Sequence, residues 1–183
     1  MKRPTPPIEW AGDHIRIIDQ TLLPAEVKFI EIRSASQAVD AIQRLAIRGA
    51  PALGAFGSLA LVVALDEIEP ESLSQARTRL EECRTLIGDA RPTAINLRWA
   101  VDRVIDQATK DGSDLTSLRS ALIREAQAVA DEDKAACDEI GRLGHELLRD
   151  ANVIGTHCNA GRLATAGSGT ALAPMYAQAQ AGE

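Results

Sequence analysis

The sequence is poor in aromatic residues and in cysteine. Aromatic side chains make up only 3% of the 183 residues, so the core has to be built from Ala, Val, Ile and Leu. The cysteines are Cys83, Cys137 and Cys158, and their odd number and wide spacing argue against a disulfide framework or a zinc knuckle. Free thiols are typical of a reducing compartment, so we expect a cytoplasmic protein.

An excess of basic charge is also missing. The chain has 20 Lys+Arg and 26 Asp+Glu, for a formal net charge of −6. Nucleic acids and anionic membranes select basic surfaces, so we expect neither as a partner. Residues 1–7 carry no apolar stretch after their charges, unlike a secretory signal. The uncharged run 49–65 is shorter than the ~20 residues that a membrane-spanning helix needs, and it predicts a buried helix instead.

The familiar cofactor motifs are absent as well. The sequence contains no HExxH, CxxC, GxGxxG or Walker pattern. Metal, dinucleotide and P-loop nucleotide sites therefore lose support, and we expect no metal and no cofactor.

What the first part of the chain does contain is the pattern of a small α+β domain. Residues 8–10 and 15–18 flank a Gly-Asp turn and predict a hairpin, and alternation over 27–32 predicts a third strand. Apolar residues at helical spacing predict helices at about 34–47, 52–65 and 70–88, and residues 91–93 lead into a fourth helix that runs through Ile105. Pro92 suits the first position of the last of these.

The second part has a different organisation. Turn formers at 110–114 precede a long helical pattern over 115–147. A short strand is predicted at 152–156, then a loop, a glycine-rich turn and a helix through Tyr176, which together make the first unit of a parallel α/β sheet. We therefore expect an α+β domain over 1–112, a connecting helix over 113–150, and over 151–183 the start of a truncated Rossmann-like α/β domain.

Two segments combine an arginine with the start of a helix. Arg48, Gly49 and Ala50 would present one forked cation together with backbone N–H groups, an arrangement that suits a phosphate. The alternative is a tight helix corner with a solvated arginine. Arg91 precedes the next such helix; there the alternative is a helix capped by Pro92 and Thr93, with Arg91 in solvent.

A third segment, 156–161, carries a thiol. Cys158 follows the predicted strand and precedes a helix, a position where its pKa can be perturbed and where it could act as acid, base or nucleophile. The alternative is a buried structural thiol next to a histidine that bonds the backbone.

These segments, with residues 19–24, resemble one family in order and approximate spacing. They read Asp-Gln-Thr-Leu-Leu-Pro at 19–24, Arg-Gly-Ala-Pro-Ala-Leu-Gly at 48–54, Arg-Pro-Thr-Ala-Ile-Asn-Leu at 91–97 and Thr-His-Cys-Asn-Ala-Gly at 156–161. The family is that of methylthioribose-1-phosphate isomerase, within the superfamily of the initiation-factor 2B regulatory subunits. The resemblance implies an aldose–ketose isomerase of methionine salvage, usually a homodimer, that converts 5-methylthioribose 1-phosphate to 5-methylthioribulose 1-phosphate.

The resemblance also implies roles for single residues. Arg48 and Arg91, with the backbone of Gly49 and Ala50, would bind the sugar phosphate. Cys158 would be the catalytic cysteine. Its neighbours Thr156 and Asn159 would contact the substrate.

The family pairs its cysteine with an aspartate that is expected beyond Glu183, so we expect this chain alone to be an inactive fragment. The alternatives are a sibling isomerase for ribose 1,5-bisphosphate or 5-deoxyribose 1-phosphate, and a non-catalytic subunit that binds a sugar phosphate or nucleotide.

Overall fold

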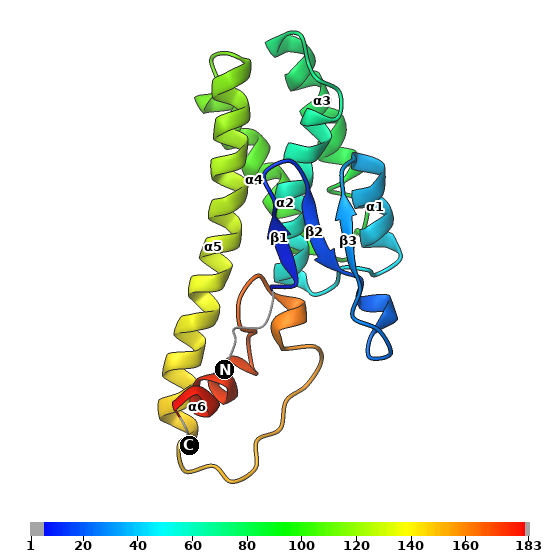
Figure 1. Cartoon of the computed structure of the whole chain (residues 1–183). Coiled ribbons are helices and arrows are strands. Elements are labelled where there is room, and N and C mark those ends of the chain that lie inside the picture. Colours follow the sequence, from blue (N-terminus) through cyan, green and yellow to red (C-terminus); the bar gives the residue numbers. More distant parts are fainter. Residues whose placement is uncertain (1–5, 182–183) are drawn as a thin grey trace.

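A computed structural model describes residues 6–181. Residues 1–5, most of the stretch compared with a signal peptide, and residues 182–183 lie outside the described part. The predicted antiparallel sheet is confirmed, with strands β1 (Ile8–Trp10), β2 (Ile15–Ile18) and β3 (Phe29–Ile32) in the order β1-β2-β3 (Figure 1). A short 3₁₀ helix, η1 (Gln20–Leu22), lies between β2 and β3. Ile15 and Ile17 are fully buried and turn one face of the sheet toward the helices.

The centre of the core is helix α2 (Ala50–Asp66), which is buried from Ala52 to Leu65. Its sequence has no charge before Asp66, so no face of it prefers water. Around it pack α1 (Ala35–Gln43), α3 (Leu73–Leu86), α4 (Ile95–Asp111) and α5 (Leu115–Leu148). The buried helix predicted from the run 49–65 is thus confirmed. Within residues 6–181, no helix is long and apolar enough to cross a membrane.

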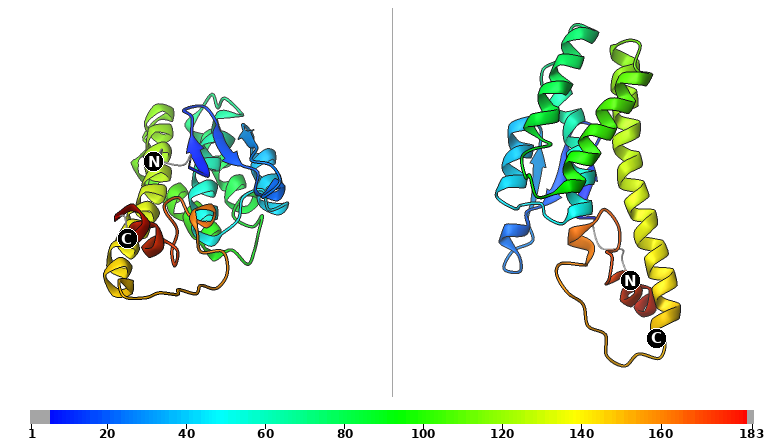
Figure 2. Two further views of the ribbon diagram at one scale, coloured as in Figure 1. Left: turned by 60° about the horizontal axis from the view of Figure 1, so that its bottom comes forward. Right: turned by 180° about the vertical axis from the view of Figure 1, so that it is seen from behind.

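Helix α5 is the long helix that the apolar spacing predicts. It starts with a capping box between Asp114 and Ser117. Its first half packs on α2 and α4, and its second half continues past them to reach α6 (Ala173–Ala181), as the views in Figures 1 and 2 show. An added Cβ at Gly144 would lie 2.3 Å from Pro174 Cγ. Glycine at this position therefore lets α6 approach α5 closely.

Two local predictions are wrong. Residues 152–156 form no strand in the described structure and run as exposed, irregular chain, with Val153 91% exposed. A strand needs a neighbour to pair its backbone groups, and none lies beside this segment among the described residues.

Pro92 does not open α4 either, because Arg91–Ala94 makes a turn (Ala94 N–H to Arg91 O, 2.9 Å) and the helix begins at Ile95. The Rossmann-like assignment and the boundaries at 112 and 150 stay predictions.

Candidate anion-binding site

Gly49 is the residue around which the candidate site is built. It is the N-cap of α2 with φ of 97°, a left-handed conformation that favours glycine. An added Cβ would lie 2.4 Å from Ala164 Cα. Both the backbone conformation and this close approach therefore require glycine. The close approach places Ala164, which is distant in sequence, next to the start of α2.

The starts of α2 and α4 lie at the same end of the core. A Cβ on Gly54 would meet the Asn96 carbonyl oxygen at 3.2 Å, and one on Gly57 would meet Leu97 Cδ1 at 2.4 Å. Residues further along α2 therefore face residues further along α4, so the two helices run in the same direction. Arg48 and Arg91, which precede these two helices, are therefore brought to the same end of the core (Figure 1).

These two helices also share uncapped N-termini. The other helices with defined caps start at side chains that accept a first-turn N–H: Ser34 on α1, Ser72 on α3 and Asp114 on α5. At α2 and α4 the N-caps are Gly49 and Ala94, and neither helix receives a side-chain cap within the described residues. The alternative in which Thr93 caps α4 is therefore wrong. First-turn N–H groups without partners, at the positive end of the helix dipole, favour an anion.

Arg48 and Arg91 differ from most arginines of the chain. Carboxylates pair with the guanidinium groups of Arg16, Arg33, Arg44, Arg79, Arg84, Arg98, Arg103, Arg119, Arg124 and Arg142. Within residues 6–181, Arg48 and Arg91 form no such pair and no side-chain hydrogen bond. Their planar forks remain available, and that geometry matches two phosphate oxygens. We call Arg48–Ala50 and Arg91–Asn96 together the anion site.

A closed loop, residues 160–170, lies against the anion site. Gly161 and Gly169 pair as an antiparallel bridge, and the Thr170 N–H donates to Ala160 O at 2.9 Å. Within the loop, Arg162–Ala164 forms the 3₁₀ helix η2. The loop is therefore a compact unit with joined ends.

The closed loop touches two elements of the N-terminal part. Ala164 packs against Gly49, and Gln20 Nε2 donates a hydrogen bond to Leu163 O at 2.8 Å. These contacts connect η1, the start of α2 and the segment that follows Cys158. They bring the segments 19–24 and 48–54 of the family resemblance against the closed loop, whose first two residues belong to the segment 156–161.

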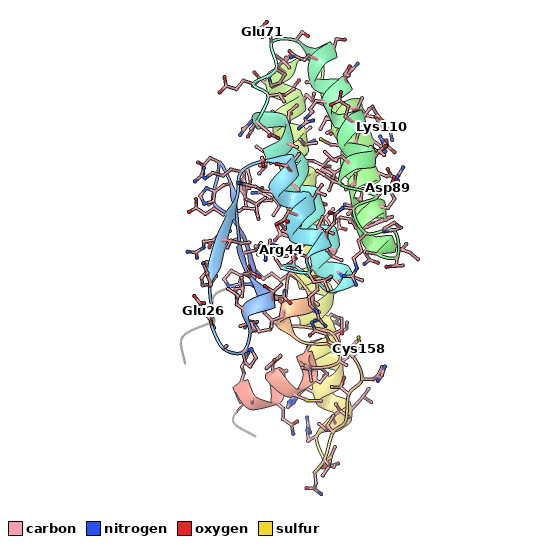
Figure 3. The ribbon with its side chains drawn as sticks, turned by 90° about the vertical axis from the view of Figure 1, so that its right-hand side faces the viewer. Glu26, Arg44, Glu71, Asp89, Lys110 and Cys158 are labelled. Carbon is pink, nitrogen blue, oxygen red and sulfur yellow. The ribbon has the colours of Figure 1, made fainter. Side chains whose placement is uncertain are left out.

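Cys158 lies on the exposed chain between α5 and the closed loop (Figure 3). Its φ of 63° is uncommon for a residue with a side chain. Because Cys158 is exposed, the alternative of a buried structural thiol does not describe it; Cys83 and Cys137 are the buried cysteines. Burial raises the pKa of the Cys83 thiol to about 11, which keeps that thiol protonated.

Thr156 and Asn159 are exposed next to Cys158. Within residues 6–181, no hydrogen bond links any of the three to Arg48 or Arg91. The structure thus groups the predicted residues in two sets. One is the anion site, and the other is the exposed segment 156–159, which carries Cys158 and directly precedes the closed loop. Among the described residues, no cluster of His, Cys, Asp or Glu could hold a metal ion.

Asp19 and Gln20 make contacts near the anion site that sequence reasoning did not predict. Asp19 is buried; it accepts hydrogen bonds from Thr21 Oγ1 at 2.7 Å and from Arg44 Nη1 at 2.7 Å. Burial raises the pKa of Asp19, but these hydrogen bonds outweigh it and hold the pKa below its usual range. This network fixes η1, from which Gln20 reaches the closed loop. In the sequence, the only indication of this network was the run 19–24, which supported the family resemblance but suggested no chemical role for its residues.

The chain is thus an α+β domain in which two helix N-termini without side-chain caps, each preceded by an arginine without a carboxylate partner among residues 6–181, start at the same end of the core. The chain belongs to the Initiation factor 2 subunit family, whose model matches residues 46–182.

Relatives in this family carry isomerase names. The chain is 41% identical over 184 residues to the 5-deoxyribose 1-phosphate isomerase of Moorella thermoacetica, which covers 100% of this chain and 52% of that protein. It is 43% identical over 173 residues to the methylthioribose-1-phosphate isomerase of Gemmatimonas aurantiaca, covering 93% and 50%. The chain thus spans about half the length of the curated relatives it matches.

Solved structures support the fold. The initiation factor eIF-2B subunit delta from A. fulgidus matches with a TM-score of 0.89 at 37% identity, over 97% of this chain and 52% of that one. The 5-methylthioribose 1-phosphate isomerase from Pyrococcus horikoshii OT3 matches with a TM-score of 0.85 at 30% identity, over 98% and 51%. The sheet and helices described above are therefore those of known family members.

Proposed function

We propose that this chain supplies the phosphate-binding site and the cysteine of an aldose–ketose isomerase that acts on 5-methylthioribose 1-phosphate. The observation that carries the proposal is the anion site: two uncapped helix N-termini, each preceded by an arginine that no carboxylate of residues 6–181 neutralises. The methylthioribose-1-phosphate isomerase names of several relatives support this substrate. Cytoplasmic location and homodimer formation remain parts of the same proposal.

The chemistry explains why such a site is needed. The phosphate sits on the anomeric oxygen, so the sugar cannot open to an aldehyde without help. The enzyme has to assist ring opening and then move a hydrogen from C2 to C1, either through an enediolate or by a hydride shift. Positioned acid and base groups contribute about 10²–10⁴-fold each. Arg48 and Arg91 would hold the phosphate, and the binding energy from this remote group would be available to the reacting centre.

Cys158 is proposed as one of the acid/base groups. It is exposed, and within residues 6–181 no carboxylate hydrogen-bonds to its thiol. The carboxylate partner that the family resemblance implies is therefore not found beside Cys158 among the described residues. We propose on this ground that the 183-residue chain alone does not turn over the substrate.

A second candidate substrate is 5-deoxyribose 1-phosphate, favoured by the name of the Moorella thermoacetica relative; ribose 1,5-bisphosphate belongs to the same group. All three substrates share the 1-phosphate and differ only at C5. Competition between them in one assay would rank the 5-substituents. A binding-only subunit is the alternative from a different class, and one solved structure that the chain resembles is named as an initiation-factor subunit. This alternative is less well supported because binding alone needs no exposed thiol.

The test is a proton-NMR assay with 5-methylthioribose 1-phosphate. It compares this chain alone with a chimera that joins it to the second half of the Gemmatimonas aurantiaca relative. We expect ketose formation by the chimera, its loss in the Cys158→Ser chimera, and none by the chain alone. Full activity of the Cys158→Ser chimera would exclude the thiol, and an inactive chimera that still binds the sugar phosphate would favour the binding-only subunit.

A further inference from the structure

The contacts between α5 and the closed loop point to a role for a residue outside the four resemblance segments. We infer that Asp133 is a positioning residue, which holds the closed loop on α5 so that Ala164 stays against Gly49 at the anion site. The inference rests on the proposed function for its consequence, but the contact itself can be tested without any ligand.

The contact is a single short hydrogen bond. Asp133 Oδ2 accepts the Ala166 N–H at 2.6 Å. The Asp133 side chain is partly buried, and burial raises the pKa of its carboxyl group. A carboxylate moved out of water costs free energy unless a donor compensates it. The Ala166 N–H is such a donor, and hydrogen bonds to charged acceptors are the stronger class.

The loop also lies directly on α5 next to this bond. An added Cβ at Gly167 would meet Cys137 Cβ at 2.8 Å and Lys134 Cα at 3.0 Å. Cys137 is 1% exposed. Gly167 therefore contributes to the cover over the Cys137 thiol, and lifting the loop from α5 would expose that thiol to reagents.

The closed loop is held at its other side by Gln20, through Leu163 O. Between the two anchors lies Thr165, which is fully buried and whose hydroxyl has no hydrogen-bond partner among residues 6–181. A buried hydroxyl without a partner is unfavourable, so the loop does not keep this position by its own bonds alone. Asp133 and Gln20 supply side-chain contacts that hold it in place.

The consequence concerns the anion site. Ala164, which touches Gly49, lies between Leu163, held by Gln20, and Ala166, held by Asp133. Loss of either anchor frees one end of this short stretch. The wall that Ala164 forms beside the start of α2 would then become mobile, and with it the orientation of the chain that carries Cys158.

The first test uses Cys137 as a reporter in the full chain carrying Cys158→Ser. The rate of thiol modification at Cys137, followed by peptide mass spectrometry, is compared for Asp133→Ala, Asp133→Asn and the control Asp131→Ala. Asp131 is an exposed aspartate on the same helix. We expect a rise of about tenfold or more for Asp133→Ala. The asparagine variant keeps an acceptor oxygen, so we expect it to stay within about threefold of the parent, and the control to stay at the parent rate.

Cys83, buried in the N-terminal core, separates local opening from unfolding. Its modification should not change in Asp133→Ala. If both thiols become reactive together because the variant unfolds, hydrogen exchange of the Ala166 amide in the unaltered chain decides: slow exchange supports the inference and unprotected exchange overturns it. A parent-like Cys137 rate in a folded Asp133→Ala variant also overturns it.

The second test measures binding of inorganic phosphate to the same aspartate variants with Cys158 intact. We expect the dissociation constant to rise several-fold in Asp133→Ala and to recover in Asp133→Asn. An exposed Cys137 with unchanged phosphate binding would overturn the positioning role. If the unaltered chain binds no phosphate, the proposed function fails. The inference is then decided by hydrogen exchange of the Gln20 side-chain amide, which donates to Leu163 O. Loss of its protection in Asp133→Ala supports the inference, and unchanged protection overturns it.

Discussion

The guanidinium groups of Arg48 and Arg91 have no carboxylate partner among residues 6–181, so they are available to bind a ligand. Most arginines of the chain are neutralised by nearby carboxylates, as Arg119 is by Asp66 at 2.6 Å. A guanidinium without such a partner binds a phosphate without first breaking an internal ion pair.

We therefore predict that Arg48→Ala and Arg91→Ala each weaken phosphate-ester binding by about tenfold or more, since charged hydrogen bonds contribute about 1.5–3 kcal/mol. Isothermal titration calorimetry measures the change. Arg149→Ala is the matched control, because Arg149 also has no ion pair within residues 6–181 but lies just after α5. Equal losses in all three variants would show a non-specific charge effect.

Asp19 gives a prediction of stability and its pH dependence. Its lowered pKa means that the folded state favours the carboxylate. This stabilisation is complete above the unfolded-state pKa of about 3.9 and is lost as the pH falls through the lower folded-state pKa. We expect Asp19→Asn to lower the free energy of unfolding by about 1–3 kcal/mol at pH 7.

The difference between parent and Asp19→Asn should shrink in urea unfolding followed by circular dichroism below pH 4. Asp40→Asn is the control, since the exposed Asp40 pairs with the same Arg44 at 2.9 Å. We expect it to cost less than about 1 kcal/mol. An equal loss in both variants would show that burial of Asp19 is not the cause.

At the scale of elements, local pattern was sufficient for most of the fold. The uncharged run 49–65 predicted a buried helix because it is shorter than a membrane-spanning helix, and the apolar spacing over many turns predicted α5. The segment 152–156 was misjudged for a different reason. Its composition suits a strand, but a strand is stable only with a partner, and pairing is a property of distant residues.

The second half of α5 carries an apolar ridge. Ile140, Leu143 and Leu147 recur on one face, and Leu147 is 84% exposed. Exposed apolar patches of this kind tend to find partners. We predict concentration-dependent self-association in sedimentation or light scattering, reduced by Leu143→Glu together with Leu147→Glu. Thr116→Glu, on the exposed first turn of α5, should leave it unchanged. A monodisperse monomer at all concentrations would contradict this.

At the scale of the whole molecule, the sequence located the candidate residues but not their assembly. Arg48 and Arg91 could be identified because each precedes a helix. That α2 and α4 start at the same end, and that neither is capped, depends on packing between helices. The contacts of Gln20 with Leu163 and of Asp133 with Ala166 join residues far apart in the chain. No local pattern carries that information.

The central claim is that the starts of α2 and α4 together bind a phosphate. The most direct measurement is an NMR titration of the ¹⁵N-labelled chain with inorganic phosphate and then with 5-methylthioribose 1-phosphate. We predict saturable shifts in the first-turn amides of Ala50, Ala52, Ile95 and Asn96, which disappear in the Arg48→Ala, Arg91→Ala double variant. Shifts confined to other residues, or none at millimolar ligand, would contradict the assignment of the anion site.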